Sequence, residues 1–111
     1  MAGARPPRRG EIWLAALDPT LGSEIQKTRP CVVISPPEMN EHLRTMIVVP
    51  MTTGSRPAPF RIAITFQRKS GLILLDQLRT LDRQRLVQRL GVVNAATLAK
   101  ALDGLRAMFA P

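Results

Sequence analysis

The sequence predicts a mainly β protein with α-helix (α+β class): a small, strongly bent antiparallel sheet or barrel of five or six short strands, with a C-terminal helix. Three observations predict it. The 111-residue chain is 45% apolar, which is enough for one domain around one core. Nine of its ten prolines lie before residue 61 and divide the first half into short pieces. From residue 94 on, apolar side chains instead recur at helical spacing.

Residues 11–17 form the first predicted strand. The run is apolar on both faces after Glu11 and stops at Asp18-Pro19, which is typical of a buried strand followed by a turn. The polar segment 20–28 is predicted to be a loop.

Two β-branched runs, residues 31–35 and 46–50, predict the next strands, and each is ended by a proline. Between them, Pro36 and Pro37 permit at most a single helical turn over residues 38–42.

Residues 60–66 alternate with period two, which predicts a strand with one apolar face. Phe60, Ile62, Ile64 and Phe66 share the core face, and Arg61, Ala63 and Thr65 share the other. A turn is expected at residues 69–71, followed by a further apolar run over 72–75 and a last strand over 86–93.

The final element is predicted to be one amphipathic helix with Asn94 as its N-cap. Its apolar positions are Leu98, Leu102, Leu105, Met108 and Phe109.

The charge pattern indicates a polyanionic partner. Sixteen Lys and Arg residues stand against eight Asp and Glu, and thirteen of the sixteen are Arg. No acidic residue occurs between Glu41 and Asp76, while five basic residues do. Nucleic acid is favoured over the alternative of a basic surface without a ligand. The aromatic residues are few and mostly expected in the core, so binding by base stacking is not favoured.

Several classes of protein are excluded by composition. No apolar run is long enough to span a membrane, and residues 1–8 are interpreted as a flexible basic arm and not as a signal peptide. We therefore expect a cytoplasmic protein with one domain over residues 9–111. Cys31 has no partner for a disulfide, and with only one histidine, His42, no zinc site is expected.

Two polar loops, residues 22–30 and 50–56, interrupt apolar strands with side chains that contact phosphate. In the first, Arg29 is followed by a proline that restricts its backbone. In the second, Thr52 and Thr53 supply hydroxyl groups beside Gly54. From spacing alone, ordinary surface turns explain both loops slightly better.

Four ordered motifs make the sequence recognisable. They are R-R-G-E-I-W-L-A-A-L-D-P-T-L-G-S-E at 8–24, K-T-R-P-C-V-V-I-S at 27–35, V-P-M-T-T at 49–53 and L-L-D-Q-L-R-T-L-D at 74–82. Together they resemble the MazF/PemK toxin family, also called mRNA interferases. The resemblance implies an SH3-like barrel, a homodimer and metal-independent, sequence-selective cleavage of single-stranded RNA without a cofactor. It also implies neutralisation by a cognate antitoxin, whose acidic, disordered segment we expect to occupy the RNA groove.

The resemblance implies catalytic roles for Arg29, Thr52 and Glu24. Arg29 stands at the family's essential arginine, and Thr52 stands at the threonine or serine beside the scissile phosphate. Glu24 matches the acid of the family's G-S-E-Q pattern, in which Ile25 here replaces the glutamine. We expect further RNA contacts from polar residues of the two loops and of the nearby strand ends: Ser23, Gln26, Lys27, Thr53, Arg56, Arg61, Asp76 and Gln77.

Two positions place the chain nearer to the family branch that depends on an Arg and Thr pair. Ser23 stands where some members carry a histidine proposed to assist catalysis. Asp76 matches an acid that is catalytic in another branch, but the arginine that works with it there is Leu74 here.

Metal-free RNA cleavage needs a base for the 2′-OH, an acid for the leaving oxygen and stabilisation of the phosphorane. We expect Arg29 to stabilise the charge and to be the candidate acid for the leaving oxygen, and Thr52 to orient the phosphate. Glu24 is the carboxylate available to hold Arg29 or accept the proton. The expected products carry 2′,3′-cyclic phosphate and 5′-OH ends.

Two other functions stay open at this point. The same barrel resembles that of the CcdB family, whose members bind DNA gyrase without catalysis. An RNA-binding module without activity is the other, because Ile25 and Leu74 depart from the family pattern.

Cys31 and Trp13 are interpreted as core residues. The charged run 79–85 fits a mutually paired surface equally as well as a dimer or RNA contact.

Overall fold

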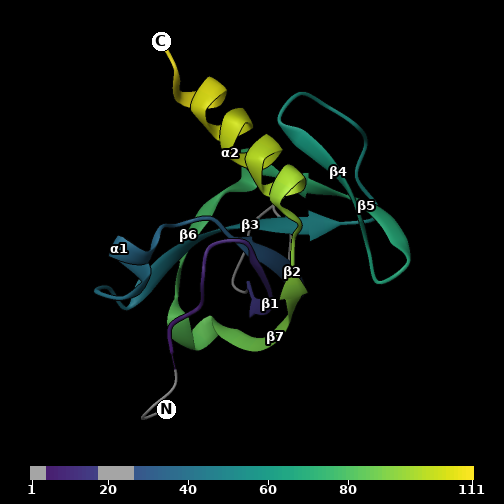
Figure 1. The fold of residues 1–111 in the computed structure, drawn as a ribbon. Helices are drawn as coiled ribbons and strands as arrows, with labels where there is room; N and C mark the ends of the chain where they lie inside the picture. Colours follow the sequence, from purple (N-terminus) through teal and green to yellow (C-terminus); the bar gives the residue numbers. More distant parts are fainter. Residues whose placement is uncertain (1–4, 18–26) are drawn as a thin grey trace.

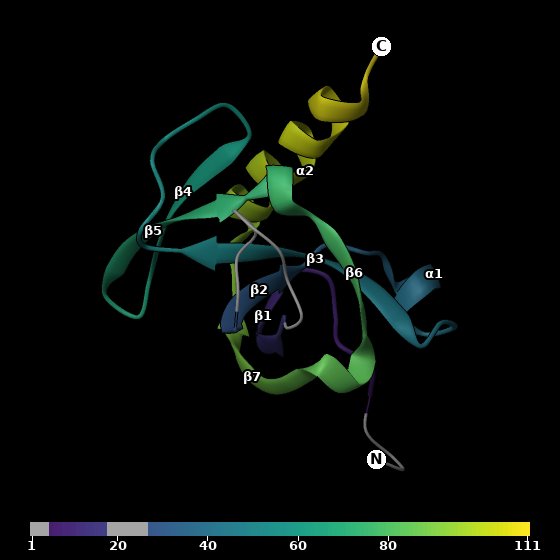
Figure 2. The same cartoon turned by 180° about the vertical axis from the view of Figure 1, so that it is seen from behind.

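The computed structural model describes residues 5–17 and 27–111, and within them the chain forms a bent antiparallel sheet with a C-terminal helix (Figures 1 and 2). The strands are β1 (Glu11–Ala16), β2 (Thr28–Val33), β3 (Thr45–Thr52), β4 (Arg61–Phe66), β5 (Lys69–Leu74), β6 (Arg79–Asp82) and β7 (Leu86–Val92). The helices are α1 (Pro37–Asn40) and α2 (Ala95–Phe109), with 3₁₀ turns η1 (Leu75–Gln77) and η2 (Arg83–Arg85). The predicted α+β class is confirmed.

Five strands curl into a half-barrel. Along the sheet the order is β4-β5-β3-β2-β1-β7, and β6 pairs with β3, so that η2 connects the strands at the two ends of this curl. Figure 1 shows β6, β3, β2, β1 and β7 as a ring, with the β4–β5 hairpin projecting to one side and α2 crossing above.

Both faces of the central strands are buried. The inside of the half-barrel, here called the barrel interior, is a cluster of Ala15, Leu17, Cys31, Val33, Met46, Val48, Leu81 and Leu86. A second cluster lies on the opposite face, and α2 contributes to it: Ile12, Val32, Ile34, Val49, Met51, Ile73, Leu75, Val93 and Ala101. Because successive side chains of a strand alternate between the two clusters, these strands have continuous apolar sequences.

Most predicted elements are confirmed. The strand at 11–17, the alternating strand at 60–66 and the last strand at 86–93 are present as β1, β4 and β7. The Asn94 side chain caps α2 by accepting a hydrogen bond of 2.8 Å from the backbone N–H of Thr97. The single helical turn after Pro36 is α1.

The predicted bounds of two strands were wrong. β2 begins at Thr28, three residues early, and β3 continues through Pro50 to Thr52. Pro50 is tolerated because β3 changes partners there: Cys31 and Pro50 are the last pair of β2 and β3, after which Met51 pairs with Ile73 of β5.

The turn predicted at 69–71 lies two residues earlier. Gln67 and Arg68 both have positive φ angles, 51° and 64°, and form the two-residue connection between β4 and β5. Neither is glycine or asparagine, so the usual sequence signal is missing.

The expected strand number was also too low, because the sheet has seven strands within the described chain. The strand β6 was not predicted as a strand, since its one buried residue, Leu81, stands among charged neighbours.

The expectation that most aromatic side chains lie in the core holds for two of the four. Trp13 and Phe66 pack against the two clusters. Phe60 and Phe109 are large exposed side chains, with 38% and 69% of their surface accessible. Phe60 precedes β4 with a φ angle of 65°, outside the strand's alternation.

Candidate active site

Arg29 and Thr52 lie at the same end of neighbouring strands. Each stands two residues beyond Cys31 and Pro50, the last registered pair of β2 and β3. Because a strand's side chains alternate, both residues face the side of the barrel interior, as Cys31 and Val48 do. We call this open end of the half-barrel, where β1 and β3 end and β2 begins, the barrel mouth.

Arg29 presents an exposed guanidinium group at the barrel mouth. Its backbone is fixed by pairing with Ala15 of β1. Across residues 5–17 and 27–111, its side chain makes no hydrogen bond or ion pair. The predicted pairing of Arg29 with Glu24 falls outside these residues. The Arg29 guanidinium can therefore donate hydrogen bonds to a phosphate oxygen.

Thr52 is half-buried, and its position is set from two sides. Its Oγ1 accepts a hydrogen bond of 3.2 Å from the backbone N–H of Gly54, which leaves the hydroxyl hydrogen available for a ligand. On the other side, a Cβ atom added to Gly71 would lie 2.6 Å from the carbonyl oxygen of Thr52. Glycine at 71 therefore permits the close β3–β5 pairing that holds Thr52.

Two arginines hold the end of β1 at the barrel mouth. Arg79 donates through Nη1 to the carbonyl oxygen of Leu17 at 3.2 Å, and Arg85 donates likewise to Ala16 at 3.1 Å. Arg79 pairs in register with Val48, so it faces the barrel interior. The sequence left the role of the run 79–85 open. The structure directs these two side chains to β1, while Asp82 caps η2 by accepting from the N–H of Gln84.

Cys31 lies beneath this end and is chemically inert as a nucleophile. Burial raises the pKa of its thiol to about 12, although the charge of Arg79 opposes the rise. The expected core role of Cys31 is confirmed, since it is fully buried.

Arg61 and Asp76, predicted as separate RNA contacts, form an ion pair. Nε and Nη2 of Arg61 donate to Oδ1 and Oδ2 of Asp76 at 3.1 and 3.0 Å, and Nη1 donates to the carbonyl oxygen of Arg56. The hydrogen bond from Arg61 lowers the pKa of Asp76, so the carboxylate stays ionised. The expected orientation of Arg61 away from the core is confirmed, since its partner Asp76 is exposed.

The structure places the remaining predicted residues as follows. Lys27, Thr53 and Arg56 are exposed, and Gln77 is half-buried beside Asp76 in η1. Ser23, Glu24 and Gln26 lie outside the described residues. Sequence reasoning named the run 79–85 but did not predict that Arg79 lies at the barrel mouth; the available signal was its period-two spacing from the apolar Leu81.

The described residues offer neither a metal site nor a membrane-spanning helix. Within the described ranges, no group of three or more His, Cys, Asp or Glu side chains could hold a metal ion. His42 is exposed, with Nδ1 2.9 Å from the carbonyl oxygen of Glu38. No helix in the described part of the chain has the length and apolar character needed to cross a membrane.

Comparison with known proteins identifies the family. A family model described as "PemK-like, MazF-like toxin of type II toxin-antitoxin system" matches residues 8–109. Endoribonuclease PemK of Escherichia coli is 43% identical over 79 residues, which are 67% of this chain and 59% of that protein. The chain thus matches somewhat over half the length of PemK. Endoribonuclease MazF of Staphylococcus epidermidis is 33% identical over 104 residues, 88% of this chain and 87% of that protein.

Comparison of the fold with solved structures indicates the same family. A crystal structure of MazF from Deinococcus radiodurans has a TM-score of 0.83 and 28% identity, covering 95% of this chain and 97% of that chain. With the family model spanning β1 to α2, the chain belongs to the PemK-like, MazF-like toxins of type II toxin-antitoxin systems.

Proposed function

We propose that this chain is an endoribonuclease toxin that cleaves single-stranded RNA sequence-selectively and without a metal ion. The observation that carries the proposal is that Arg29, exposed and without a side-chain partner among residues 5–17 and 27–111, lies at the same end of the sheet as Thr52. The relatives named Endoribonuclease PemK and Endoribonuclease MazF support the same activity.

In this mechanism the RNA 2′-OH attacks the adjacent phosphorus, and the bond to the 5′-oxygen breaks. Arg29 stabilises the extra negative charge of the phosphorane and donates the proton that the leaving 5′-oxygen takes up, and Thr52 donates a hydrogen bond that orients the phosphate. Glu24 holds Arg29 or accepts the 2′-OH proton. The products carry 2′,3′-cyclic phosphate and 5′-OH ends. RNA contacts come from Ser23, Gln26, Lys27, Thr53, Arg56, Gln77 and the Arg61–Asp76 pair.

We also propose the partners and the setting of this activity. The active form is a homodimer, and a cognate antitoxin neutralises it by placing an acidic segment in the RNA groove, as the toxin-antitoxin family implies. The protein acts in the cytoplasm, with one domain over residues 9–111.

The test is incubation of the purified protein with a long single-stranded RNA in excess EDTA, with cut ends mapped by primer extension. Wild type should cut at discrete sites. Arg29→Ala and Thr52→Ala should each lower the rate by about a hundredfold or more, as expected when a donor to the developing charge is removed. Arg106→Ala on α2 and Thr80→Ala on β6 are matched controls, because both residues are exposed and lie outside the proposed site.

Two results would contradict the proposal. If Arg29→Ala and Thr52→Ala cut at the wild-type rate, these residues do not form the active site. If wild type leaves the RNA intact but binds it, the chain is an RNA-binding module, and binding to DNA gyrase would be measured next.

A further inference from the structure

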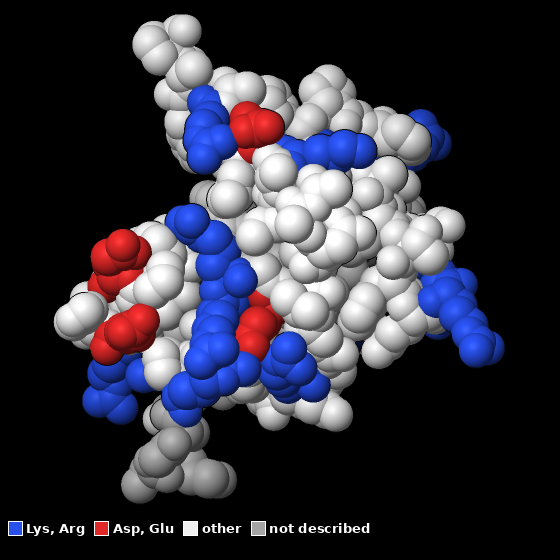
Figure 3. Space-filling view, viewed as in Figure 1, with Lys and Arg blue, Asp and Glu red and all other residues white. Residues whose placement is uncertain are grey.

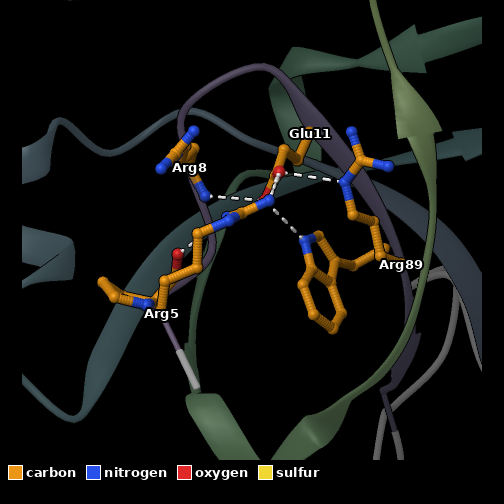
Figure 4. A network of polar contacts seen from close by, with 6 residues as sticks. Arg5, Arg8, Glu11 and Arg89 are labelled. Atoms are coloured by element: carbon orange, nitrogen blue, oxygen red, sulfur yellow. Dashed lines mark hydrogen bonds and ion pairs between the residues drawn. The ribbon is translucent and has the colours of Figure 1, made fainter. Parts of the chain in front are cut away.

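A buried carboxylate organises several arginines at the end of β1 opposite the barrel mouth (Figure 4). Glu11 is only 4% exposed. Its carboxylate accepts hydrogen bonds from Nη1 and Nη2 of Arg5 at 3.2 and 2.5 Å and from Nε of Arg89 at 2.9 Å. The backbone N–H of Arg8 and Nε1 of Trp13 also donate to it, at 2.8 and 3.1 Å. The network fixes the N-terminal arm to β1 and β7.

The exposed groups of this network are positively charged. Glu11 is buried, whereas the side chains of Arg5 and Arg89 are 42% and 46% exposed. Burial raises the pKa of Glu11, but the hydrogen bonds from Arg5, Arg8, Trp13 and Arg89 outweigh it and lower the pKa to about 2. Glu11 therefore stays ionised and holds the two guanidinium groups in place across the working pH range.

Two more arginines extend this cluster. Arg8 is exposed, and within the described residues its side chain makes no hydrogen bond or ion pair; Figure 4 shows it directed away from Glu11. Arg9 is anchored through Nε to the carbonyl oxygen of Ile34 at 2.9 Å. Arg5, Arg8, Arg9 and Arg89 together are here called the arm surface, and Figure 3 shows a band of basic side chains over the N-terminal arm beside α1.

The arm surface borders a concave site. A cavity of about 550 Å³ lies between residues 5–9 and the α1 region, where Pro37, Asn40 and Glu41 line it. The four arginines outnumber the two glutamates, Glu11 and Glu41. No large exposed apolar side chain lines this cavity.

We propose that the arm surface is a second RNA-binding site, which takes backbone phosphates outside the cleaved segment. The proposal rests on the proposed ribonuclease function for its substrate. β1 runs from the arm surface to the barrel mouth, roughly 17 Å at about 3.3 Å per residue. An RNA must therefore extend beyond the few nucleotides at the cleavage position to contact both sites.

RNA fits this surface better than an acidic protein segment does. The lining of the cavity includes Pro6, Pro7 and Pro37, but no aromatic or large aliphatic side chain that could anchor a folded protein segment. Phosphates bind to cationic side chains. The guanidinium groups of Arg5 and Arg89 are already held in position by the buried Glu11 carboxylate, so binding a phosphate does not have to order them further.

The experiment measures binding and not cleavage, so it is independent of activity. The probes are two RNAs with a 2′-deoxy nucleotide at the cleavage position mapped above, one five nucleotides long and the other twenty. Their affinity is measured by fluorescence anisotropy over a salt series for wild type, Arg8→Gln and Arg8→Glu. Arg8 is chosen because its side chain makes no hydrogen bond or ion pair within the described residues. Arg106→Gln on α2 is the control for loss of one surface charge.

For the twenty-nucleotide RNA, Arg8→Gln should weaken affinity about fivefold and lower the slope of log affinity against log salt by about 0.7, the value for one phosphate contact on a single strand. Arg8→Glu should weaken it by more than tenfold. The five-nucleotide RNA should lose less than twofold with either variant. Arg106→Gln should change both RNAs by less than twofold.

Three results would overturn the proposal. Wild-type affinity of both Arg8 variants for the long RNA would show that the arm surface does not contact it. Equal losses for the short and long RNAs would place Arg8 at the cleavage site. Unchanged RNA affinity with weaker binding of a twenty-residue poly-glutamate peptide would assign the surface to a protein partner. If wild type binds but does not cut RNA, the proposed function fails while this proposal can still hold.

Discussion

Gly71 of β5 lies so close to Thr52 of β3 that a Cβ atom on it would be 2.6 Å from the Thr52 carbonyl oxygen. The obstacle is backbone and not the end of a flexible side chain, so the strand pair itself must move to accept a larger residue. Gly71 thereby sets the position of Thr52, whose hydroxyl we propose to be catalytic.

We therefore expect Gly71→Ala to displace Thr52 and to lower the RNA cleavage rate by about tenfold or more. The free energy of unfolding should fall by only about 1–2 kcal/mol, because the change adds one methyl group. Cleavage assays and urea denaturation measure the two effects. The control is Gly104→Ala in α2, whose Cβ would meet the Cδ1 atom of Leu75 in η1, which is the end of a side chain and not backbone. Full cleavage by Gly71→Ala would contradict the role of this contact.

The Glu11 network predicts a stability that depends on acid pH. The folded-state pKa of Glu11, about 2, lies below its ordinary value of 4.5. Ionised Glu11 therefore stabilises the fold fully above about pH 5, and this contribution is lost as the pH falls through 2. Glu11→Gln should lower the free energy of unfolding at pH 7 by about 3 kcal/mol and much less at pH 2.

Urea denaturation of wild type and Glu11→Gln over a pH series measures this difference. Glu38→Gln, in the exposed first turn of α1, is the control and should change the unfolding free energy little at any pH. A difference between wild type and Glu11→Gln that does not vary with pH would show that the charge of Glu11 is not what stabilises the arm.

Arg79 is predicted to stabilise the barrel mouth through its bond to the Leu17 carbonyl. Arg79→Gln should lower the free energy of unfolding by about 1–2 kcal/mol, since a charged hydrogen bond across 62 residues is lost. Arg83→Gln, in η2, is the matched control. Equal stability of the two variants would show that the Leu17 contact contributes nothing measurable.

Cys31 should not react in the folded protein. With a thiol pKa near 12 and full burial, the thiolate is scarce and shielded at pH 8. A disulfide reagent added to native protein should label it only at the rate of unfolding, and denaturant should make labelling rapid. Rapid stoichiometric labelling of native protein would place the thiol at the surface.

The sequence by itself determined the elements whose patterns are local. The alternation of Ile62, Ile64 and Phe66 predicts β4, and Asn94 followed by apolar residues at helical spacing predicts α2. The four ordered motifs at 8–24, 27–35, 49–53 and 74–82 were enough together to identify the family, because they involve residue identity and order alone.

Only the tertiary structure decided the features that depend on partners distant in the chain. β3 passes through Pro50 because the strand changes partners there, and the charged run 79–82 is a strand because β3 offers it an edge. Strand register placed Arg29 and Thr52 at the same end of neighbouring strands, and folding joined Arg61 to Asp76 and Arg5 and Arg89 to Glu11. Periodicity reports which face of an element is buried, whereas pairing across the sheet is set by the packing of the whole chain.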